Sequence, residues 1–512
     1  MPPEPLLRRN GQAHLKSKVE TMSQEPPSTR VPEPLSLTEA IIPIAALVLL
    51  LGLSYYLFGD EAAAGPNQIA LMFSTVVASF VAVRRGHDFD SLRDAAVASV
   101  TAGLSAIFIL LAVGSLIGTW ALSGTLIAMV YYGLQLLSPD YFYVTTMLIC
   151  AVVALSIGSS WTVAGTIGIG LIGIAREMDL DPAITAGAVI SGAYFGDKSS
   201  PLSDATNLAC VAAGAKLYAH VKEALWTSVP ALAGAMVLFW LLGEPREYDA
   251  SVASAGIEAA FNISLLSFLP LVLVLTLAIL RYPPFVTIFL GALAGALLAV
   301  VAAPDRVIAF ASAPDLAPGF ALLKGVWSAL ATGYVSDIGD PEIDRLLSRG
   351  GMESMLGTIW LILAALAFGG VVEKAGVIDK LFSPIIRAAK STGALISTLV
   401  AAALSANVLA ADQYIAIVLP GRMFQKVFHD RKLQPLVLSR AIGDSATVTS
   451  ALIPWNSCGA YMAATLGIAT VSFAPYCFFN ILNPLVTILF GFLGIRMLRT
   501  GENATTKPST PA

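Results

Sequence analysis

The segment Gly196-Asp197-Lys198-Ser199-Ser200-Pro201-Leu202-Ser203-Asp204 decides how this sequence is interpreted. It places two carboxylates, one ammonium group and three hydroxyl groups between apolar stretches. Residues 183–195 before it carry no charge, and residues 205–217 after it carry only Lys216. Ionisable groups at membrane depth are costly, so they usually face a charged partner or a water-filled cavity. The segment therefore predicts a transport site.

The composition agrees with a membrane-embedded chain. Of the 512 residues, 56% are hydrophobic and 12% are charged, against roughly 25% charged residues in soluble domains. Apolar runs long enough to cross a bilayer recur from residue 40 to residue 496. We expect an all-α polytopic membrane protein with broken helices. The four cysteines lie in apolar segments without metal-like spacing, and no basic domain is present, so we expect no cofactor and no nucleic acid partner.

Polarity divides the chain into five parts. The first lacks the apolar core of a signal peptide and is polar and proline-rich. In chain order, the predicted parts are a disordered cytoplasmic tail over 1–38, a first membrane half over 39–303, a polar connecting segment over 304–355, a second membrane half over 356–498 and a polar cytoplasmic tail over 499–512.

The two membrane halves resemble each other. Pro182 and Pro201 are 19 positions apart, as are Pro435 and Pro454, and the two pairs are offset by 253 positions. The same offset places Ser159 opposite Asp412, Asp197 opposite Ser450 and Ser203 opposite Asn456. Two proline pairs can coincide by chance, but the matching apolar blocks around them favour an internal repeat.

Equivalent loops of the two halves differ in charge. The connection 176–181 has three acids against one arginine, whereas its counterpart 422–434 has four bases against one acid. Basic loops favour the cytoplasm, so this pattern predicts an inverted-topology repeat, an arrangement common in secondary transporters. The basic loop 84–93 and the acidic stretch Gly59-Asp60-Glu61 place the amino terminus in the cytoplasm. We expect a multi-pass protein of the cell inner membrane.

The broken segments supply oxygen ligands. Pro201 has no N–H, so the backbone carbonyl of Asp197 is expected to be free to bind an ion, together with its side chain. Asp197 and Asp204 are seven positions apart and would share one face of an intact helix. Hard cations such as Na⁺ prefer several oxygens, and a carboxylate that holds either a proton or a cation is sufficient for exchange. Lys198 could pair with an aspartate or extend toward the membrane surface.

The predicted site draws on both halves. The predicted ion-binding and proton-coupling residues are Asp197, Asp204, Ser199, Ser203, Thr206, Asn207, Asp412, Asp444, Thr447, Thr449 and Asn456, with Na⁺ at Asp197 and Asp204. The predicted supporting residues are Lys198, Pro201, Ser159, Ser160, Thr162, Asn407 and Pro454.

Some of these residues have simpler interpretations. Asp412 and Asp444 could each instead be a hydrogen-bonded structural aspartate or a helix N-cap, an alternative that weighs more for Asp412. Trp161 and Trp455 are candidates for the cavity wall. His220 and His429 are expected to lie in solvated loops.

Two motifs resemble a known family. The stretch Gly196-Asp-Lys-Ser-Ser-Pro-Leu-Ser-Asp204-Ala-Thr-Asn207-Leu-Ala resembles the signature of the NhaC-type sodium/proton antiporters, and Gly443-Asp-Ser-Ala-Thr-Val-Thr-Ser-Ala-Leu-Ile-Pro-Trp-Asn-Ser-Cys-Gly-Ala-Tyr-Met462 resembles their second signature. The resemblance covers about residues 38–498. One departure is Gly443, where the family often has an acidic residue, which leaves Asp444 as the remaining acid.

This resemblance implies an ion-transporter fold of inverted repeats with re-entrant hairpins, whose tips would fall at 156–166 and 405–413. It also implies Na⁺ and H⁺ as substrates, and it suggests a homodimer. The favoured function is exchange of cytoplasmic Na⁺, and also Li⁺, for external H⁺. The alternative is a sodium- and proton-coupled organic anion exchanger, such as a malate/lactate antiporter, because the same family includes such exchangers. No nucleophile–base pair, phosphate loop or metal motif indicates an enzyme, and a channel would not need two occluding half-sites.

Overall fold

The computed structural model describes residues 32–59, 62, 65–243, 257–258, 263–337, 344 and 347–500. Most of the two predicted tails, and the acidic pair Asp60-Glu61 used to orient the chain, lie outside these ranges. Residues 32–36 are non-helical, and the first described helix begins at Leu37.

The described part of the chain is almost entirely helical. The first half contains α2 (Leu37–Phe58), α3 (Pro66–Arg84), α4 (Phe89–Ala102), α5 (Leu104–Ser123), α6 (Thr125–Leu136), α7 (Phe142–Ile157), α8 (Ser160–Val163), the π-helical turn η3 (Ala164–Gly168), α9 (Ile169–Glu177), α10 (Pro182–Ser199), α11 (Asp204–Ala213), α12 (Leu217–Leu241), α14 (Leu269–Ile279) and α15 (Pro284–Ala302). The connecting segment and second half contain α16 (Pro304–Ala311), α17 (Pro318–Ala331), α19 (Leu356–Lys374), α20 (Val377–Ala388), α21 (Thr392–Leu409), α22 (Gln413–Asp430), α23 (Pro435–Ile442), the π-helical turn η6 (Gly443–Thr447), η7 (Ser450–Leu452), α24 (Ser457–Leu466), α25 (Thr470–Phe473) and α26 (Phe478–Leu493).

Within these ranges, eight helices are long and apolar enough to span a bilayer, and two further helix pairs pass the same test but are bent by 49° and 53°. The all-α polytopic membrane fold is therefore confirmed. The polar connecting segment also contains helices, and one of them, α17, packs against α5.

The helix boundaries repeat along the chain. The proline-led helices α10 and α23 begin 253 positions apart, at Pro182 and Pro435. The helices after the two breaks, α11 and α24, begin and end at the same offset, and each terminates at a left-handed glycine, Gly214 or Gly467. The stretch from α8 to α9 and the single helix α22 also match at both ends. The chain therefore carries two copies of one helical arrangement, whose matched segments are residues 158–214 in the first copy and residues 411–467 in the second. The inverted orientation of the two copies stays a prediction.

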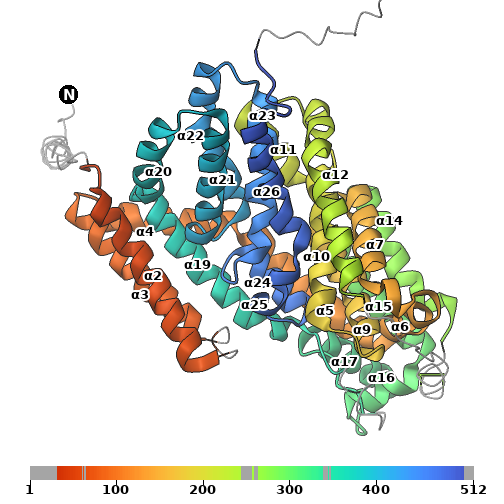
Figure 1. Ribbon diagram of the computed structural model, residues 1–512. Coiled ribbons are helices and arrows are strands. Elements are labelled where there is room, and N and C mark those ends of the chain that lie inside the picture. Colours follow the sequence, from red (N-terminus) through yellow and green to blue (C-terminus); the bar gives the residue numbers. More distant parts are fainter. Residues whose placement is uncertain are drawn as a thin grey trace, which may run out of the picture.

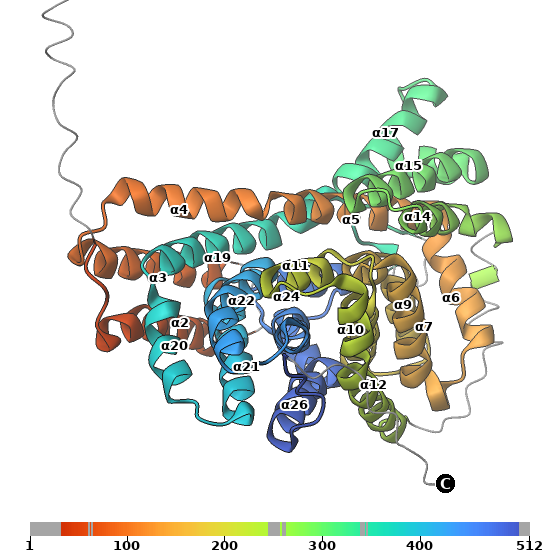
Figure 2. The same cartoon turned by 90° about the horizontal axis from the view of Figure 1, so that it is seen from above.

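The two copies interlock. The short helix α11 of the first copy packs against α22 and α23 of the second. Conversely, α24 of the second copy packs against η3 and α9 of the first. Figure 2 shows α11 and α24 close to the middle of the molecule, between α22 on one side and α10 on the other. Each break is thus held by the opposite copy.

The remaining helices flank this centre. Helix α19 packs on α3 and α4, and α5 packs on α15 and α17. In Figure 1, α2 and α3 form one flank of the molecule, while α14 to α17 lie on the far flank. The two copies therefore place their breaks in the interior.

Candidate functional site

The first break separates α10 from α11. Helix α10 ends at Ser199, and Ser203 caps α11 by accepting a hydrogen bond from the Thr206 amide at 3.2 Å. The expectation that the backbone carbonyl of Asp197 is free is wrong, because it accepts hydrogen bonds from the Ser200 amide (3.2 Å) and the Thr206 hydroxyl (3.2 Å). The side chain of Asp197 remains the group that this residue offers to an ion.

The first predicted hairpin tip holds Asp197. Both the amide and the hydroxyl of Ser160 donate to Asp197 Oδ2, at 3.1 and 2.6 Å. The preceding Gly158 has φ +77°, and a Cβ on it would lie 2.7 Å from the carbonyl carbon of Leu202. Only glycine fits where the hairpin tip touches the break, so this close approach fixes Ser160 against Asp197.

In the second copy, the hairpin tip and the broken helix make the equivalent contact, but the acidic residue stands on the hairpin tip and not on the broken helix. Gln413 and Ser450 stand 253 positions after Ser160 and Asp197, and the Ser450 hydroxyl donates to Gln413 Oε1 at 3.0 Å. In the first copy the acid is on the broken helix. In the second copy the acid is Asp412 on the hairpin tip, where it also caps α22 through the amides of Tyr414 (2.9 Å) and Ile415 (3.1 Å).

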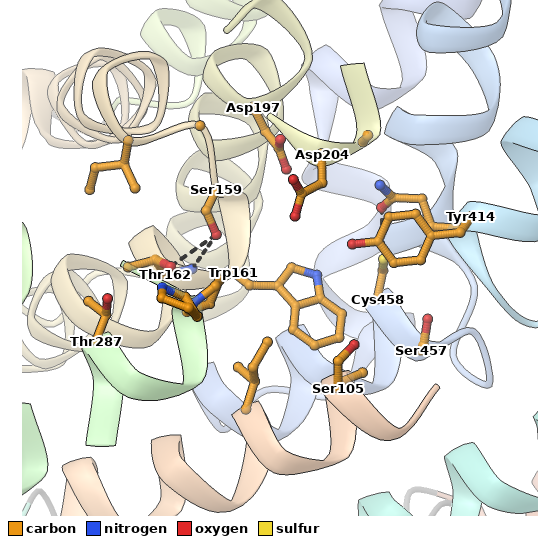
Figure 3. Close-up of a pocket in the computed structure, with 18 of the residues that line it drawn as sticks. Ser105, Ser159, Trp161, Thr162, Asp197, Asp204, Thr287, Tyr414, Ser457 and Cys458 are labelled. Atoms are coloured by element: carbon orange, nitrogen blue, oxygen red, sulfur yellow. Dashed lines mark hydrogen bonds between the residues drawn. The ribbon is translucent and has the colours of Figure 1, made fainter. Parts of the chain in front are cut away.

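A cavity of about 520 Å³ opens between the two copies. Three carboxylates line it, those of Asp197, Asp204 and Asp412. Figure 3 shows Asp197 and Asp204 directed into the same space, above the indole of Trp161 and facing the ring of Tyr414. Asp197 and Asp412 are only 7% and 6% exposed, whereas Asp204 is exposed to the cavity. Within the described residues Asp204 makes no side-chain hydrogen bond or ion pair.

Oxygen and aromatic groups complete the wall. Trp161 stacks on Tyr461 with ring centroids 4.0 Å apart, and its carbonyl accepts a hydrogen bond from the Tyr461 hydroxyl at 2.8 Å. The other polar, charged and aromatic residues of the wall are Ser105, Ser159, Thr162, Arg281, Tyr282, Thr287, Gln413, Tyr414, Ser457 and Cys458. Trp455 does not reach the cavity; its indole N–H donates to the Val408 carbonyl at 2.8 Å.

Two other predicted residues lie away from the cavity. Lys198 forms an ion pair with Asp444, and it donates to the Ser228 hydroxyl at 2.6 Å. Asp444 also accepts hydrogen bonds from Asn483 at 3.1 Å and from Thr487. Of the two alternatives for Lys198, the structure shows pairing, with an aspartate of the second copy. Asp444 is thus the partner of a buried lysine.

Most of the remaining predicted polar residues hold the breaks together. Asn407 donates to the Ala446 carbonyl (2.7 Å) and to Thr449 (2.9 Å), and Asn456 donates to the Asn407 carbonyl (3.0 Å). Asn207 donates to the Ser203 carbonyl at 2.8 Å. Four predicted residues, Ser199, Pro201, Thr447 and Pro454, lie outside the cavity wall and are not placed by these contacts.

Sequence reasoning misplaced one histidine and missed several charged groups. His220 is fully buried in α12 with its Nδ1 2.9 Å from the Ser439 hydroxyl, so the expectation of a solvated histidine is wrong. His429 is exposed, as expected. Glu223 forms ion pairs with Arg440 and Arg496. The cavity residue Arg281 was also missed, although its position between two apolar runs was a usable signal.

The donor set suits a hard monovalent cation. No group of three or more His, Cys, Asp and Glu side chains that could hold a metal ion occurs in the part of the chain that the structure describes. The cavity instead presents carboxylate, hydroxyl and amide oxygens, which are the ligands that hard cations prefer.

Comparison with known proteins agrees with this chemistry. Residues 192–495 match the model of the Na⁺/H⁺ antiporter family. The chain is 36% identical to the Na⁺/H⁺ antiporter NhaC of Alkalihalophilus pseudofirmus, covering 84% of this chain and 90% of that protein. It is 32% identical to the Na⁺/H⁺ antiporter NhaC of Bacillus subtilis, covering 83% and 92% of the two chains. It is 33% identical to the malate-2H⁺/Na⁺-lactate antiporter of Bacillus subtilis, covering 90% and 96%.

Proposed function

The chain belongs to the Na⁺/H⁺ antiporter family, and from this premise we propose that it exchanges cytoplasmic Na⁺ for external H⁺. One observation carries the proposal: Asp197 and Asp204, from either side of a helix break, line one cavity with Asp412 of the other copy. Their carboxylates bind either protons or Na⁺. Li⁺ is a second hard cation that the same oxygens would accept.

The exchange follows from competition at these carboxylates. When Na⁺ occupies Asp197 and Asp204, the positive ion disfavours protonation, so loading Na⁺ releases the proton that the acids held. Reloading the proton on the other side of the membrane expels Na⁺. Ser160 orients Asp197 through its two hydrogen bonds, and the hydroxyls of Ser159, Thr162 and Ser457 supply neutral oxygens at the wall. Asp412, which lies in the cavity, contributes in preference to Asp444.

The location of the protein follows the same reasoning. We place it in the cell inner membrane with its amino terminus in the cytoplasm, because the basic loops 84–93 and 422–434 then lie on the cytoplasmic side. A homodimer remains an expectation from the family.

The proposal is tested by proton flux in proteoliposomes that contain a pH-sensitive dye. We expect Na⁺ and Li⁺ to drive proton movement in the native protein, and the Asp197→Asn variant to abolish it while the protein still folds and inserts. The matched control is Asp430→Asn, an exposed acid at the end of α22. Retained exchange in Asp197→Asn would contradict the assignment.

A second candidate function is sodium- and proton-coupled exchange of organic anions. The volume of the cavity and the presence of Arg281 in its wall favour this candidate, as does the similarity to the malate-2H⁺/Na⁺-lactate antiporter. Supplying malate or lactate in the same flux assay distinguishes it, since these anions would alter the proton flux only if they are carried.

A further inference from the structure

One tyrosine of the second copy, Tyr461 on α24, holds the first hairpin tip. Its hydroxyl donates to the Trp161 carbonyl at 2.8 Å. Its ring stacks on the Trp161 indole, with the ring centroids 4.0 Å apart and an angle of 15° between the planes. Tyr461 is fully buried, so both contacts are made in the interior of the protein. Together they fix the backbone and the side chain of Trp161.

The hairpin is shaped to receive this tyrosine. Helix α24 packs against the π-helical turn η3, which follows α8 directly. Turns of this kind are rare and occur frequently at functional sites. The second residue of η3 is Gly165, where a Cβ would lie 2.9 Å from the Tyr461 hydroxyl oxygen. A larger residue at this position would crowd the hydroxyl that bonds to Trp161.

Trp161 connects this restraint to the predicted ion site, because it follows Ser160 directly in sequence. The Ser160 amide and hydroxyl donate to Asp197 Oδ2 at 3.1 and 2.6 Å. The stretch of backbone that Tyr461 holds at Trp161 is therefore the stretch that places both donors on Asp197. A side chain of one copy thus restrains the carboxylate of the other.

The second copy cannot form this anchor. At the 253-residue offset, Trp161 corresponds to Tyr414, and Tyr461 corresponds to Leu208 on α11. Leucine has neither a ring nor a hydroxyl, so the pair Tyr414 and Leu208 can form neither the stack nor the hydrogen bond. Tyr414 is 45% exposed, whereas Trp161 is half-buried. The anchor therefore belongs to the hairpin that holds Asp197.

We propose that Tyr461 is a positioning residue for Na⁺/H⁺ exchange, which keeps the Ser160 donors on Asp197 by anchoring Trp161 and so sets the balance between Na⁺ and protons at this carboxylate. The inference rests on the proposed function and deepens it, by naming a residue of the second copy that tunes the site in the first. Hydrogen bonds to a carboxylate favour its ionised form. Loss of the anchor should therefore favour protons over Na⁺.

The variant Tyr461→Phe tests the hydroxyl alone, because it keeps the ring and the stack. We expect the apparent KM for Na⁺ to rise about three- to tenfold at fixed pH, as for one lost hydrogen bond, with little change in the maximal flux. The increase should shrink at alkaline pH, where few protons compete, and a general loss of stability would not produce that pH profile. Tyr461→Leu copies the residue of the second copy and should raise KM further. The matched control is Tyr56→Phe on α2, an 86% exposed tyrosine outside the cavity wall.

A double variant tests whether Tyr461 acts through Ser160. Residues in one chain of contacts have effects that are not independent. Ser160→Ala combined with Tyr461→Phe should therefore raise KM by clearly less than the product of the two single increases. Single effects that multiply would show that Tyr461 acts on transport by another route and would overturn the inference.

Hydrogen exchange tests the anchor without transport. Tyr461→Phe should speed amide exchange over residues 159–163, while residues 412–416 of the second hairpin keep their native rates. Native exchange rates at both hairpins overturn this inference, as does a native KM and pH profile in a variant that still exchanges Na⁺ for H⁺. Absence of Na⁺-driven flux in the native protein instead removes the proposed function, and hydrogen exchange then still decides whether Tyr461 holds the hairpin.

Discussion

Lys198 and Asp444 form an ion pair that is closed off from solvent, with side chains 1% and 0% exposed. Lys198 follows the cavity residue Asp197 directly in sequence, yet it contacts Asp444 in the π-helical turn η6 of the other copy. The pair therefore links α10 of the first copy to η6 of the second copy, outside the cavity wall. It places a positive and a negative charge in the interior, where each depends on the other.

Removing one member of this pair should destabilise the protein strongly. Asp444→Asn leaves the Lys198 ammonium buried without a counter-charge, which typically costs about 3–5 kcal/mol. We expect a large fall in the thermal unfolding midpoint in detergent. The double variant Lys198→Met with Asp444→Leu should recover most of it, because two apolar groups can replace a buried pair. A double variant as unstable as Asp444→Asn would contradict this explanation.

Asp412 has two possible roles that one substitution separates. Asparagine caps helices about as well as aspartate, so Asp412→Asn should keep the bonds to Tyr414 and Ile415 and change the unfolding free energy little. Asp412→Ala should lose about 1 kcal/mol through the missing cap. If the negative charge of Asp412 contributes to Na⁺ binding in the cavity, as we propose, Asp412→Asn also lowers the apparent affinity for Na⁺ in the flux assay. An unchanged apparent affinity for Na⁺ in Asp412→Asn would leave only the capping role.

Ser160 should affect how Na⁺ competes with protons. Its hydroxyl donates to the Asp197 carboxylate, and hydrogen bonds to charged groups contribute about 1.5–3 kcal/mol. Ser160→Ala removes a bond that favours the ionised acid, so protons compete better and the apparent KM for Na⁺ should rise about tenfold at fixed pH. Ser156→Ala on α7 is the control, since the Ser156 hydroxyl donates to the Val152 carbonyl, outside the cavity. The idea fails if both variants give the native KM.

The two hairpin turns should respond differently to a change of one methyl group. Gly158→Ala would force a Cβ to 2.7 Å from Leu202 at φ +77°, so we expect a lower unfolding midpoint and reduced flux. The equivalent residue of the second copy, Ala411, already has φ +56°. Alanine is strained in that region by about 1–2 kcal/mol, so Ala411→Gly should be neutral or stabilising. A midpoint that changes in the same direction in both variants would count against this reading of the turns.

Labelling from the two sides of the membrane tests the inverted orientation of the copies. Asp179 and Lys432 stand 253 positions apart, both are exposed, and both are left-handed with φ +53° and +57°. Three of the native cysteines are buried away from the cavity. Cys458 lines the cavity and is replaced by serine, so a membrane-impermeant maleimide should report on introduced cysteines. We expect Asp179→Cys to be labelled from outside and Lys432→Cys from the cytoplasm. Labelling of both from one side would show a parallel repeat.

Sequence patterns predicted those features that depend on local chemistry. Proline spacing pointed to both helix breaks, because Pro201 and Pro454 each lack the N–H of a helical hydrogen bond, and the equal spacing of the two proline pairs set the 253-residue register. A proline alone does not mark a break, since Pro230 and Pro420 lie inside α12 and α22. The isolated acids Asp197 and Asp204 were recognised because charges are rare in apolar segments, and both line the cavity.

Contacts between distant segments could not be predicted in this way. The partner of Lys198 depends on how α10 packs on η6, and the burial of His220 depends on how α12 packs on α23. Arg281 reaches the cavity only because the connection from α14 to α15 folds over it. Spacing along one helix indicates which residues share a face, but it does not show which distant helix covers that face.

The shared register of the two copies has a consequence for how this protein can change. Because the matched segments of the two copies lie 253 residues apart, as Ser160 and Gln413 do, an acid can be moved from the broken helix to the hairpin by point substitution, without any change in chain length. New ion preferences are therefore accessible by redistributing carboxylates within a constant architecture.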